Sequence, residues 1–424
     1  MTPSLSRTRP TPQHPRLKRL FVRYTRVPMQ NDIVYLDHAA TTPLDERVFE
    51  AMLPYLGKTP NGLPRGNPSS LHAPGVFARE AIEEARAYVA RLVGAEDPGE
   101  ILFTAGGTES DNLAVLGLAA ADSDKKHVVI SAVEHPAVRE AAAHLEATGY
   151  EVTSIGVAAD GLVSTEELAG ALRPDTALAA VMWANNEVGA VQPVEEIAAI
   201  CCEAGVPLHV DAVQTAGRLA IDVSRVPVAT LALSAHKLYG PQGVGALYLR
   251  EGVDLKPTLF GGGQEKGLRS GTENVAGVVG FGMAARLAFE ESGERARHEE
   301  ALRGALISGA LNISGVRLNG HREKRLSNNV HVSVEGVEAE SLVLFLDALG
   351  CAVGSGSACA SSMVGHKASP VLLAMNRTPE EAVSSIRITV GKDTTPEEVN
   401  RFLDSFATAI AQLRELSPLY TSKN

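Results

Sequence analysis

The feature that most constrains the fold is a regular alternation of short apolar segments with longer amphipathic ones, beginning near Ile33. The apolar segments read as near-continuous strands, which is typical of a sheet covered by helices on both faces. One amphipathic segment, residues 75–93, places Ala81, Ile82 and Ala85 on a single stripe with charges opposite. This alternation predicts an α/β fold with a mainly parallel sheet. The predicted strands are EILFT (100–104), HVVISAV (127–133), ALAAVMWA (177–184), VPLHV (206–210), TLALSA (230–235) and GALYL (245–249).

After Gly271 the pattern changes, and it indicates a second, smaller domain. A long helical stretch at about 275–310 is followed by NNVHVSV, a further helix, a loop and SSIRITV. A chain of 424 residues is long enough for two domains. We therefore predict a large domain of residues 46–290. Residues 31–45 with 291–424 are predicted to form a smaller α+β domain.

The first 31 residues differ from the rest in charge, since they hold seven Lys and Arg and no acidic residue. Prolines interrupt any helix there, so we expect residues 1–30 to form a basic disordered tail. An Arg-rich targeting segment and a segment that binds nucleic acid or an anionic surface are the alternatives. The formal charge of the whole chain, −11, argues against a protein that coats nucleic acid. No apolar run approaches membrane-spanning length.

Four cysteines without disulfide or zinc spacing suit a reducing compartment, so we predict a cytoplasmic protein and no metal site. Cys201, Cys202 and Cys351 read as packing residues. Cys359 differs because its neighbours are Ser, Gly and Ala, which predicts a mobile, solvent-reachable loop. An incidental loop cysteine and a functional thiol are both open at this point.

Polar side chains follow four successive predicted strands. They are His135, Asn186, Asp211 and Lys237, separated by 51, 25 and 26 residues, close to one or two strand–helix units each. Ligands of open α/β sheets bind at the carboxyl ends of the strands. The sequence therefore predicts that these side chains share one site.

A fifth strand end carries a candidate phosphate cradle. In EILFTAGGTESDNLA, Gly106 and Gly107 let backbone N–H groups approach an anion at a helix N-terminus. Thr108 with Asp111 fits a capping box, so a plain capped helix is the alternative. A phosphate cradle, a strand-end carboxylate and a strand-end lysine together fit pyridoxal phosphate. In that reading Lys237 carries the cofactor and Asp211 keeps the pyridine nitrogen protonated.

The chain resembles the NifS/IscS-type cysteine desulfurases, class V pyridoxal phosphate enzymes of fold type I. The resemblance runs from about Val34 to about Phe406 and rests on ten motifs that occur in the family's order. They are YLDHAATTP, GNPSSLH, FTAGGTESDNLA, EHPAV, NNEVG, HVDAVQ, SAHKLYGPQGVGALY, GGGQEKGLRSGTEN, SGSACAS and SSIRITVGKDTT.

The resemblance implies a role for each matching position. Lys237 matches the lysine that carries the cofactor, Asp211 the partner of the pyridine nitrogen, and His135 the histidine stacked on the ring. Cys359 matches the thiol that takes the sulfur. The remaining matches are Gln214 to the ring hydroxyl, Gly107, Thr108, Ser234 and His236 to the phosphate, Asn186 and Arg387 to the substrate carboxylate, and Thr272 to the phosphate held by the other subunit of a homodimer.

The resemblance also implies the reaction: L-cysteine gives L-alanine, and sulfur passes to Cys359 as a persulfide. A sulfur-acceptor protein, such as an iron–sulfur scaffold or a thiolation relay protein, then receives it. We expect neither a membrane nor a nucleic acid as partner. A selenocysteine lyase, a related class V aminotransferase and a non-catalytic sulfur-relay partner are the alternatives. The sequence departs from the family at His38, at Lys266 and in the segment after Cys359, and it does not identify the acceptor.

Overall fold

The computed structural model describes residues 33–57, 66–355 and 368–416. Its largest sheet has seven strands in the order β2-β8-β7-β6-β5-β3-β4, and the pairs from β7 to β4 are parallel. The predicted mainly parallel α/β sheet is confirmed. The strands are β2 (Ile101–Thr104), β3 (His127–Ser131), β4 (Glu151–Ile155), β5 (Thr176–Ala180), β6 (Leu208–Asp211), β7 (Thr230–Ser234) and β8 (Gly245–Leu249).

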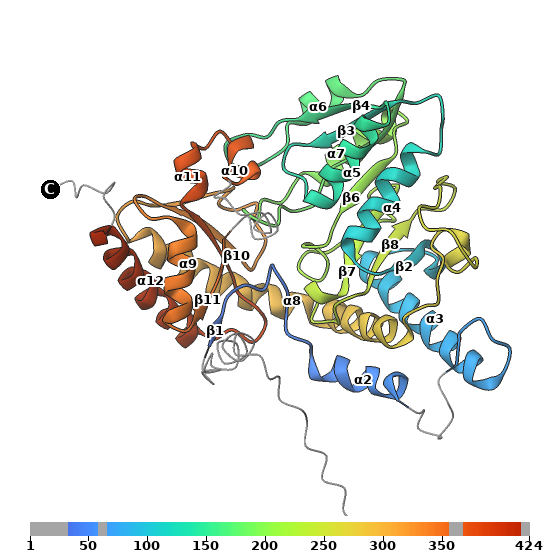
Figure 1. Cartoon of the computed structure of the whole chain (residues 1–424), viewed down its shortest axis with the longest axis horizontal. Coiled ribbons are helices and arrows are strands. Elements are labelled where there is room, and N and C mark those ends of the chain that lie inside the picture. The colour runs from blue at the N-terminus through green and yellow to red at the C-terminus, as the bar shows by residue number, and fades with distance from the viewer. Residues whose placement is uncertain (1–32, 58–65, 356–367, 417–424) are drawn as a thin grey trace, which may run out of the picture.

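Helices cover both faces of this sheet (Figure 1). Successive strand residues point to opposite faces, and β2 shows the consequence. Its Leu102 packs with α4 (Gly107–Ala119) and α5 (Pro136–Ala147), while Ile101 and Phe103 pack with the opposite set of helices. That set comprises α3 (Ala73–Val93), α7 (Val194–Glu203) and α8 (Val275–Leu311). The near-continuous apolar strands of the sequence therefore follow from burial on two sides.

A second group of elements lies beside the large sheet and has its own core (Figure 1). Its four-stranded sheet has the order β12-β13-β10-β9, and β1 pairs in parallel with β11. Val34 and Leu36, far away in sequence, pack in this core. The elements are β1 (Val34–Tyr35), β9 (Val316–Leu318), β10 (Asn329–Val334), α9 (Ala339–Ala348), β11 (Cys351–Ala352), β12 (Gly354–Ser355), β13 (Ser385–Thr389) and α12 (Pro396–Leu416).

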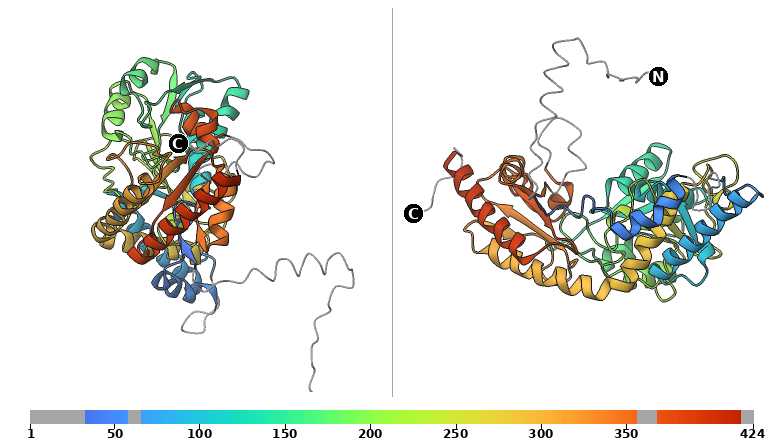
Figure 2. Two further views of the ribbon diagram at one scale, coloured as in Figure 1. Left: turned by 90° about the vertical axis from the view of Figure 1, so that its left-hand side faces the viewer. Right: turned by 90° about the horizontal axis from the view of Figure 1, so that it is seen from below.

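One long helix, α8, joins the two groups. It has 37 residues and runs along the underside of the molecule from one core to the other (Figure 2, right). Its Phe281 packs in the core of the large sheet, and its Leu306 packs in the core of the smaller one. The predicted domain limits stay a prediction, and the predicted tail lies outside the described residues.

Short helices that follow residues 356–367 in the sequence pack against the core of the large sheet. Val371 and Met375 belong to the core of the large sheet, so α10 (Pro370–Ala374) packs against that core rather than against the smaller one.

Arg325 links the two groups of elements through hydrogen bonds. It is buried, and its guanidinium donates to the carbonyl of Val188 at 2.6 Å and to Asn329 Oδ1 at 2.9 Å. The remaining helices are α2 (Glu46–Leu56), α6 (Thr165–Ala171) and α11 (Pro379–Val383).

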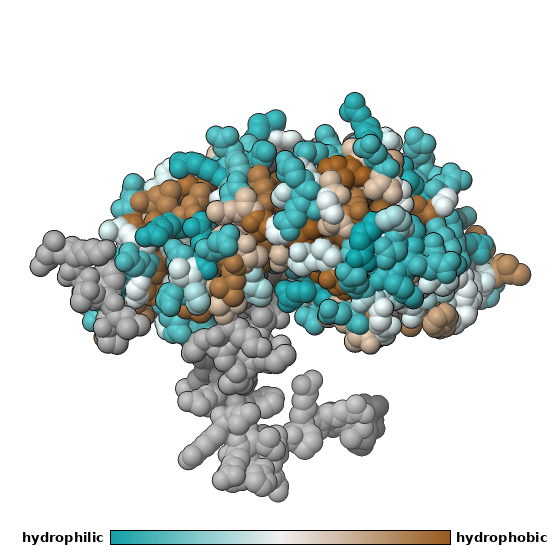
Figure 3. Space-filling view, turned by 90° about the horizontal axis from the view of Figure 1, so that it is seen from above, coloured by the Kyte–Doolittle hydropathy of each residue, from teal (hydrophilic) through white to brown (hydrophobic). Residues whose placement is uncertain are grey.

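The surface is mixed in polarity. On the face seen in Figure 3, hydrophilic residues predominate and hydrophobic residues gather in limited areas between them. Among the helices of the described segments, none combines the length and the apolar character needed to cross a membrane.

Candidate active site

A cavity of about 460 Å³ lies at the carboxyl ends of the parallel strands. His135 follows β3, Asn186 follows β5, Asp211 ends β6 and Lys237 follows β7, and all four line this cavity. Parallel strands present their carboxyl ends at one edge of a sheet, so side chains far apart in sequence meet there. The cavity is also lined by the predicted residues Gly107, Thr108, Gln214, Ser234, His236 and Arg387.

The first turn of α4 forms one wall and opens into an adjoining cavity of about 850 Å³, which Gly107, Thr108, Ser234 and His236 also line. The helix begins directly after Gly106, whose φ of 156° favours glycine. A Cβ on Gly107 would come within 2.7 Å of Val213, so the close approach requires glycine. The predicted capping box is wrong: Gly106 is the N-cap, without a side-chain cap, and Asp111 is buried instead.

Backbone carbonyls hold the Lys237 side chain at the cavity wall. Its Nζ donates hydrogen bonds to the carbonyls of Ala39 at 2.5 Å and Ala40 at 2.7 Å. Gln214 Nε2 donates to the same Ala39 carbonyl at 3.0 Å. The ammonium and the amide therefore lie close together, because both donate to the Ala39 carbonyl in the segment that follows β1.

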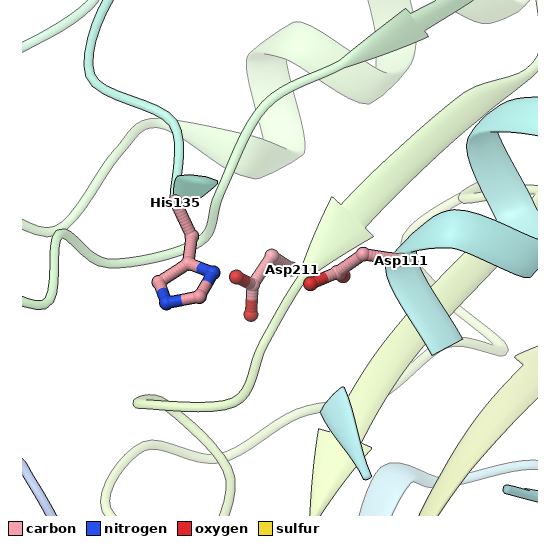
Figure 4. Close-up of side chains that lie close together, drawn as sticks. All are labelled: Asp111, His135 and Asp211. Atoms are coloured by element: carbon pink, nitrogen blue, oxygen red, sulfur yellow. The ribbon is translucent and has the colours of Figure 1, made fainter. Parts of the chain in front are cut away.

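Asp211 and His135 point toward one another, with Asp111 on the far side of Asp211 (Figure 4). One ligand atom from each of the three lies within 4.8 Å of the others. Burial raises the pKa of Asp211, while His135 and Lys237 oppose that rise. Such a trio could ligate a cation, but Asp211 and His135 are already predicted to face the cofactor ring. The cluster therefore belongs to the site described here.

His236 is a neutral group at this site. Burial, reinforced by the charge of Lys237, lowers the pKa of His236 to about 4. Its Nδ1 lies 3.1 Å from Thr41 Oγ1. At neutral pH the imidazole can therefore offer an anion a hydrogen bond but not a positive charge.

Arg387 closes the other end of the cavity, where two groups hold its guanidinium. Asn186 accepts through its backbone carbonyl at 2.9 Å, and Asp37 accepts through Oδ1, also at 2.9 Å. The Arg387 side chain is 5% exposed. Within the described part of the chain its Nε has no hydrogen-bond partner. A guanidinium at the wall of a cavity suits an anionic ligand such as a carboxylate.

Several residues of the site were not predicted from the sequence as functional. Asp37 lies in the YLDHAATTP motif but was given no role. Arg139 and Glu187 also line the cavity. Burial raises the pKa of Glu187 to about 7, and its carboxylate accepts from Ser369 Oγ at 2.5 Å. The sequence shows Glu187 as a polar residue after β5. Whether its side chain points into the cavity depends on the turn that follows the strand.

One predicted residue is not brought to this cavity, and the position of another is not described. Thr272 is exposed and is not among the described residues that line either cavity. Cys359 lies outside the described residues. Of the cysteines expected to pack, Cys201 and Cys351 are buried, but the expectation for Cys202 is wrong because it is exposed. Cys202 lies on the outer side of α7, where the helix faces solvent.

The described residues fit pyridoxal phosphate. A helix N-terminus with a glycine approach suits the phosphate, and a buried carboxylate suits a protonated pyridine nitrogen. An amine that could bond to the aldehyde lies between them. The departures His38 and Lys266 do not disturb this set. His38 Nδ1 lies 3.0 Å from the Thr389 carbonyl, and Lys266 Nζ donates to the Gly99 carbonyl.

Comparison with known proteins identifies the family. Residues 34–402 match the model of the family described as aminotransferase class-V. The chain is 45% identical over 387 residues to "Cysteine desulfurase IscS 1" of Archaeoglobus fulgidus, covering 91% of this chain and 99% of that protein. It is 47% identical over 391 residues to "Cysteine desulfurase IscS" of Neisseria meningitidis, covering 91% and 94%.

Solved structures agree with the sequence comparison. A structure titled "NIFS-LIKE PROTEIN" superposes with a TM-score of 0.83 at 37% identity, covering 90% of this chain and all of that one. A structure titled "SspA in complex with cysteine" superposes with a TM-score of 0.72 at 34% identity, covering 85% and 99%. The matched fold, the ordered motifs and the convergent strand ends lead to one conclusion. The chain belongs to the class V aminotransferase family, and within it to the NifS/IscS-type cysteine desulfurases.

Proposed function

We propose that the protein is a pyridoxal phosphate-dependent cysteine desulfurase, which takes sulfur from L-cysteine, releases L-alanine and carries the sulfur as a persulfide on Cys359. The observation that carries the proposal is that groups suited to the cofactor and a group suited to the substrate carboxylate line one cavity. Lys237 and Asp211 supply the groups suited to the cofactor, and Arg387 lines the same cavity with a guanidinium suited to a carboxylate. The names of the relatives support the same activity.

The residues that would hold the cofactor divide by chemistry. The first turn of α4, with Ser234 and neutral His236, would bind the phosphate. Asp211 would hold the pyridine nitrogen, and His135 would cover the ring. His135 is fixed for this because its Nδ1 accepts a hydrogen bond from the backbone N–H of Ala137 at 3.1 Å. When bound, pyridoxal phosphate supplies an electron sink for the bonds at the substrate Cα.

The chain's own groups would do the rest. Arg387 orients L-cysteine by binding its carboxylate, since Asp37 and the Asn186 carbonyl already fix the guanidinium plane. Lys237 Nζ takes the proton from Cα as a general base. The Cys359 thiolate then attacks the substrate sulfur. The S–S bond forms as the Cβ–S bond breaks, the electron pair stays on the carbon skeleton, and protonation there yields alanine.

The test of this function is incubation of the purified protein with L-cysteine and a thiol reductant. We expect alanine and sulfide in equal amounts, without any keto acid. An aminotransferase would need a keto-acid acceptor, and a non-catalytic relay partner would form neither product. A much higher rate with selenocysteine than with cysteine would favour the selenocysteine lyase alternative.

We also propose that the protein is a homodimer in which Thr272 of each subunit completes the phosphate site of the other. Thr272 is exposed, and the apolar side chains Phe49, Leu53 and Phe260 are exposed as well, Phe260 by 80%. These side chains are suited to burial against a second copy of the chain. A single subunit does not bring Thr272 to its own cavity, so a second copy would supply it.

Mixing two inactive variants tests this sharing. In a mixed dimer of Lys237→Ala and Thr272→Ala subunits, both defects fall in the same pocket, and the other pocket is intact. We expect activity to return after subunit exchange, approaching half that of the parent per dimer. Native mass spectrometry would verify the exchange. Verified mixed dimers without any regained activity would contradict a shared pocket.

The sulfur acceptor and the location in the cell complete the proposal. An iron–sulfur scaffold or a thiolation relay protein is the acceptor that the family resemblance implies, and a cytoplasmic location fits the cysteine usage. The segment after Cys359, where the sequence departs from the family, lies partly outside the described residues. We propose an acceptor protein by chemistry alone: one that presents a free thiolate to a persulfide.

A further inference from the structure

A buried hydrogen-bonded chain runs from Asp111, which lines the cavity beside Asp211, to His209 and Thr230, which do not line it. Asp111 Oδ1 lies 3.2 Å from His209 Nε2, and His209 Nδ1 lies 2.9 Å from Thr230 Oγ1. Asp111 is 1% exposed, and His209 and Thr230 are fully buried. Polar groups buried so completely are costly unless each has a partner.

The positions of these residues connect the two ends of the cofactor site. His209 and Asp211 are two apart on β6, so both side chains point to the face of the sheet that α4 covers. Asp111 lies in α4, one turn after the phosphate cradle of Gly107 and Thr108. The Asp111–His209 bond therefore fastens the helix that carries the cradle to the strand that carries Asp211.

The charges around Asp111 and Asp211 are unequal. Burial, with the neighbouring carboxylates Asp211 and Glu134, raises the pKa of Asp111 well above its usual range. Asp211 instead faces His135 and Lys237, which favour its charged form. Burial lowers the pKa of His209 to about 3, so its imidazole is neutral at neutral pH. Two carboxylates this close and this buried do not both ionise readily.

We propose that Asp111 and His209 form a positioning pair, in which Asp111 is a neutral carboxylic acid that donates its proton to the hydrogen bond with His209. This assignment satisfies every hydrogen bond of the chain. The Asp111 hydroxyl donates to His209 Nε2, and His209 Nδ1–H donates to Thr230 Oγ1. The negative charge stays on Asp211, and the phosphate cradle keeps its position relative to Asp211. The inference rests on the proposed placement of the cofactor ring beside Asp211.

The first test compares two substitutions of Asp111 in the holoenzyme. Asn is nearly the same shape as the neutral acid, and its amide can donate to His209 Nε2. Leu has the same branched skeleton with bulkier methyl groups, and it leaves a buried nitrogen without a partner. We expect Asp111→Asn to retain pyridoxal phosphate on dilution as the parent does. Asp111→Leu should retain it roughly tenfold less tightly, as expected for one buried hydrogen bond lost. Visible absorbance of the bound cofactor measures both.

The second test does not depend on the Leu variant folding. Infrared spectroscopy of the parent holoenzyme should show the carbonyl stretch of a protonated carboxyl group that disappears in Asp111→Asn. The matched control is Glu134→Gln. Burial raises the pKa of Glu134 to about 8, so its band should disappear separately and leave that of Asp111 in place.

The outcomes separate this inference from the proposed function. The positioning pair would be overturned if Asp111→Asn lost cofactor as readily as Asp111→Leu, or if the parent spectrum lacked the Asp111 band. A folded Asp111→Leu that retains cofactor like the parent would also overturn it. If the parent protein failed to bind pyridoxal phosphate through Lys237, the proposed function itself would fail.

Discussion

Replacing Lys237 by Ala is expected to reduce the release of alanine and sulfide roughly 10³-fold or more, because the change removes both the attachment point of the cofactor and the general base at Cα. The visible absorbance of bound pyridoxal phosphate should change with it. The fold should persist, since Lys237 lies at the wall of the cavity, where its Nζ donates to the backbone carbonyls of Ala39 and Ala40. Assays of both products with a circular dichroism spectrum would measure these effects.

A matched control for this variant is Lys256→Ala. Lys256 is about half exposed and pairs with Asp254 on the surface, so its loss should leave turnover unchanged. Exposed ion pairs of this kind contribute little to stability. Turnover by Lys237→Ala at near the parental rate would show that another group carries the cofactor.

Replacing Cys359 by Ala is expected to separate binding from sulfur transfer. The variant should bind pyridoxal phosphate and L-cysteine, because Lys237, Asp211 and Arg387 are unchanged. Alanine and sulfide formation should fall about 10²-fold or more, since no thiolate attacks the substrate sulfur. In the parent, mass spectrometry after brief exposure to L-cysteine should find one extra sulfur on the peptide that contains Cys359.

The exposed Cys202 provides the control for this experiment. Because it is accessible, it would acquire sulfur if labelling were non-specific, and Cys202→Ala should leave turnover at the parental rate. Most of the added sulfur on Cys202, or full sulfide release by Cys359→Ala, would contradict the proposed mechanism.

Local patterns in the sequence predicted the large sheet well. Each of the six predicted strands corresponds to an observed one, because a strand covered on both faces must be apolar along its whole length. The same reasoning explains why β4 was not predicted from the sequence. It lies at the edge of the sheet, where its residues are largely exposed or half-buried, so Glu151–Ile155 has no continuous apolar run.

The sequence also determined which residue types stand at the carboxyl ends of the strands. His135, Asn186, Asp211 and Lys237 could be selected because each follows a recognisable strand. Parallel topology then brings their side chains to one edge, whatever the details of packing. The motif order added the family and the cofactor, which comparison with known proteins confirmed.

What only the tertiary structure decided is how these residues are held. Asp111 fits a capping box by its spacing from Thr108, yet it is buried against His209, because α4 packs on the face of β6 to which that histidine points. Asp37 reaches Arg387 across 350 positions of sequence. Such contacts join elements that the chain brings together only by folding. Local pattern does not encode them, because a side chain's partner across the core depends on how the helices and strands pack.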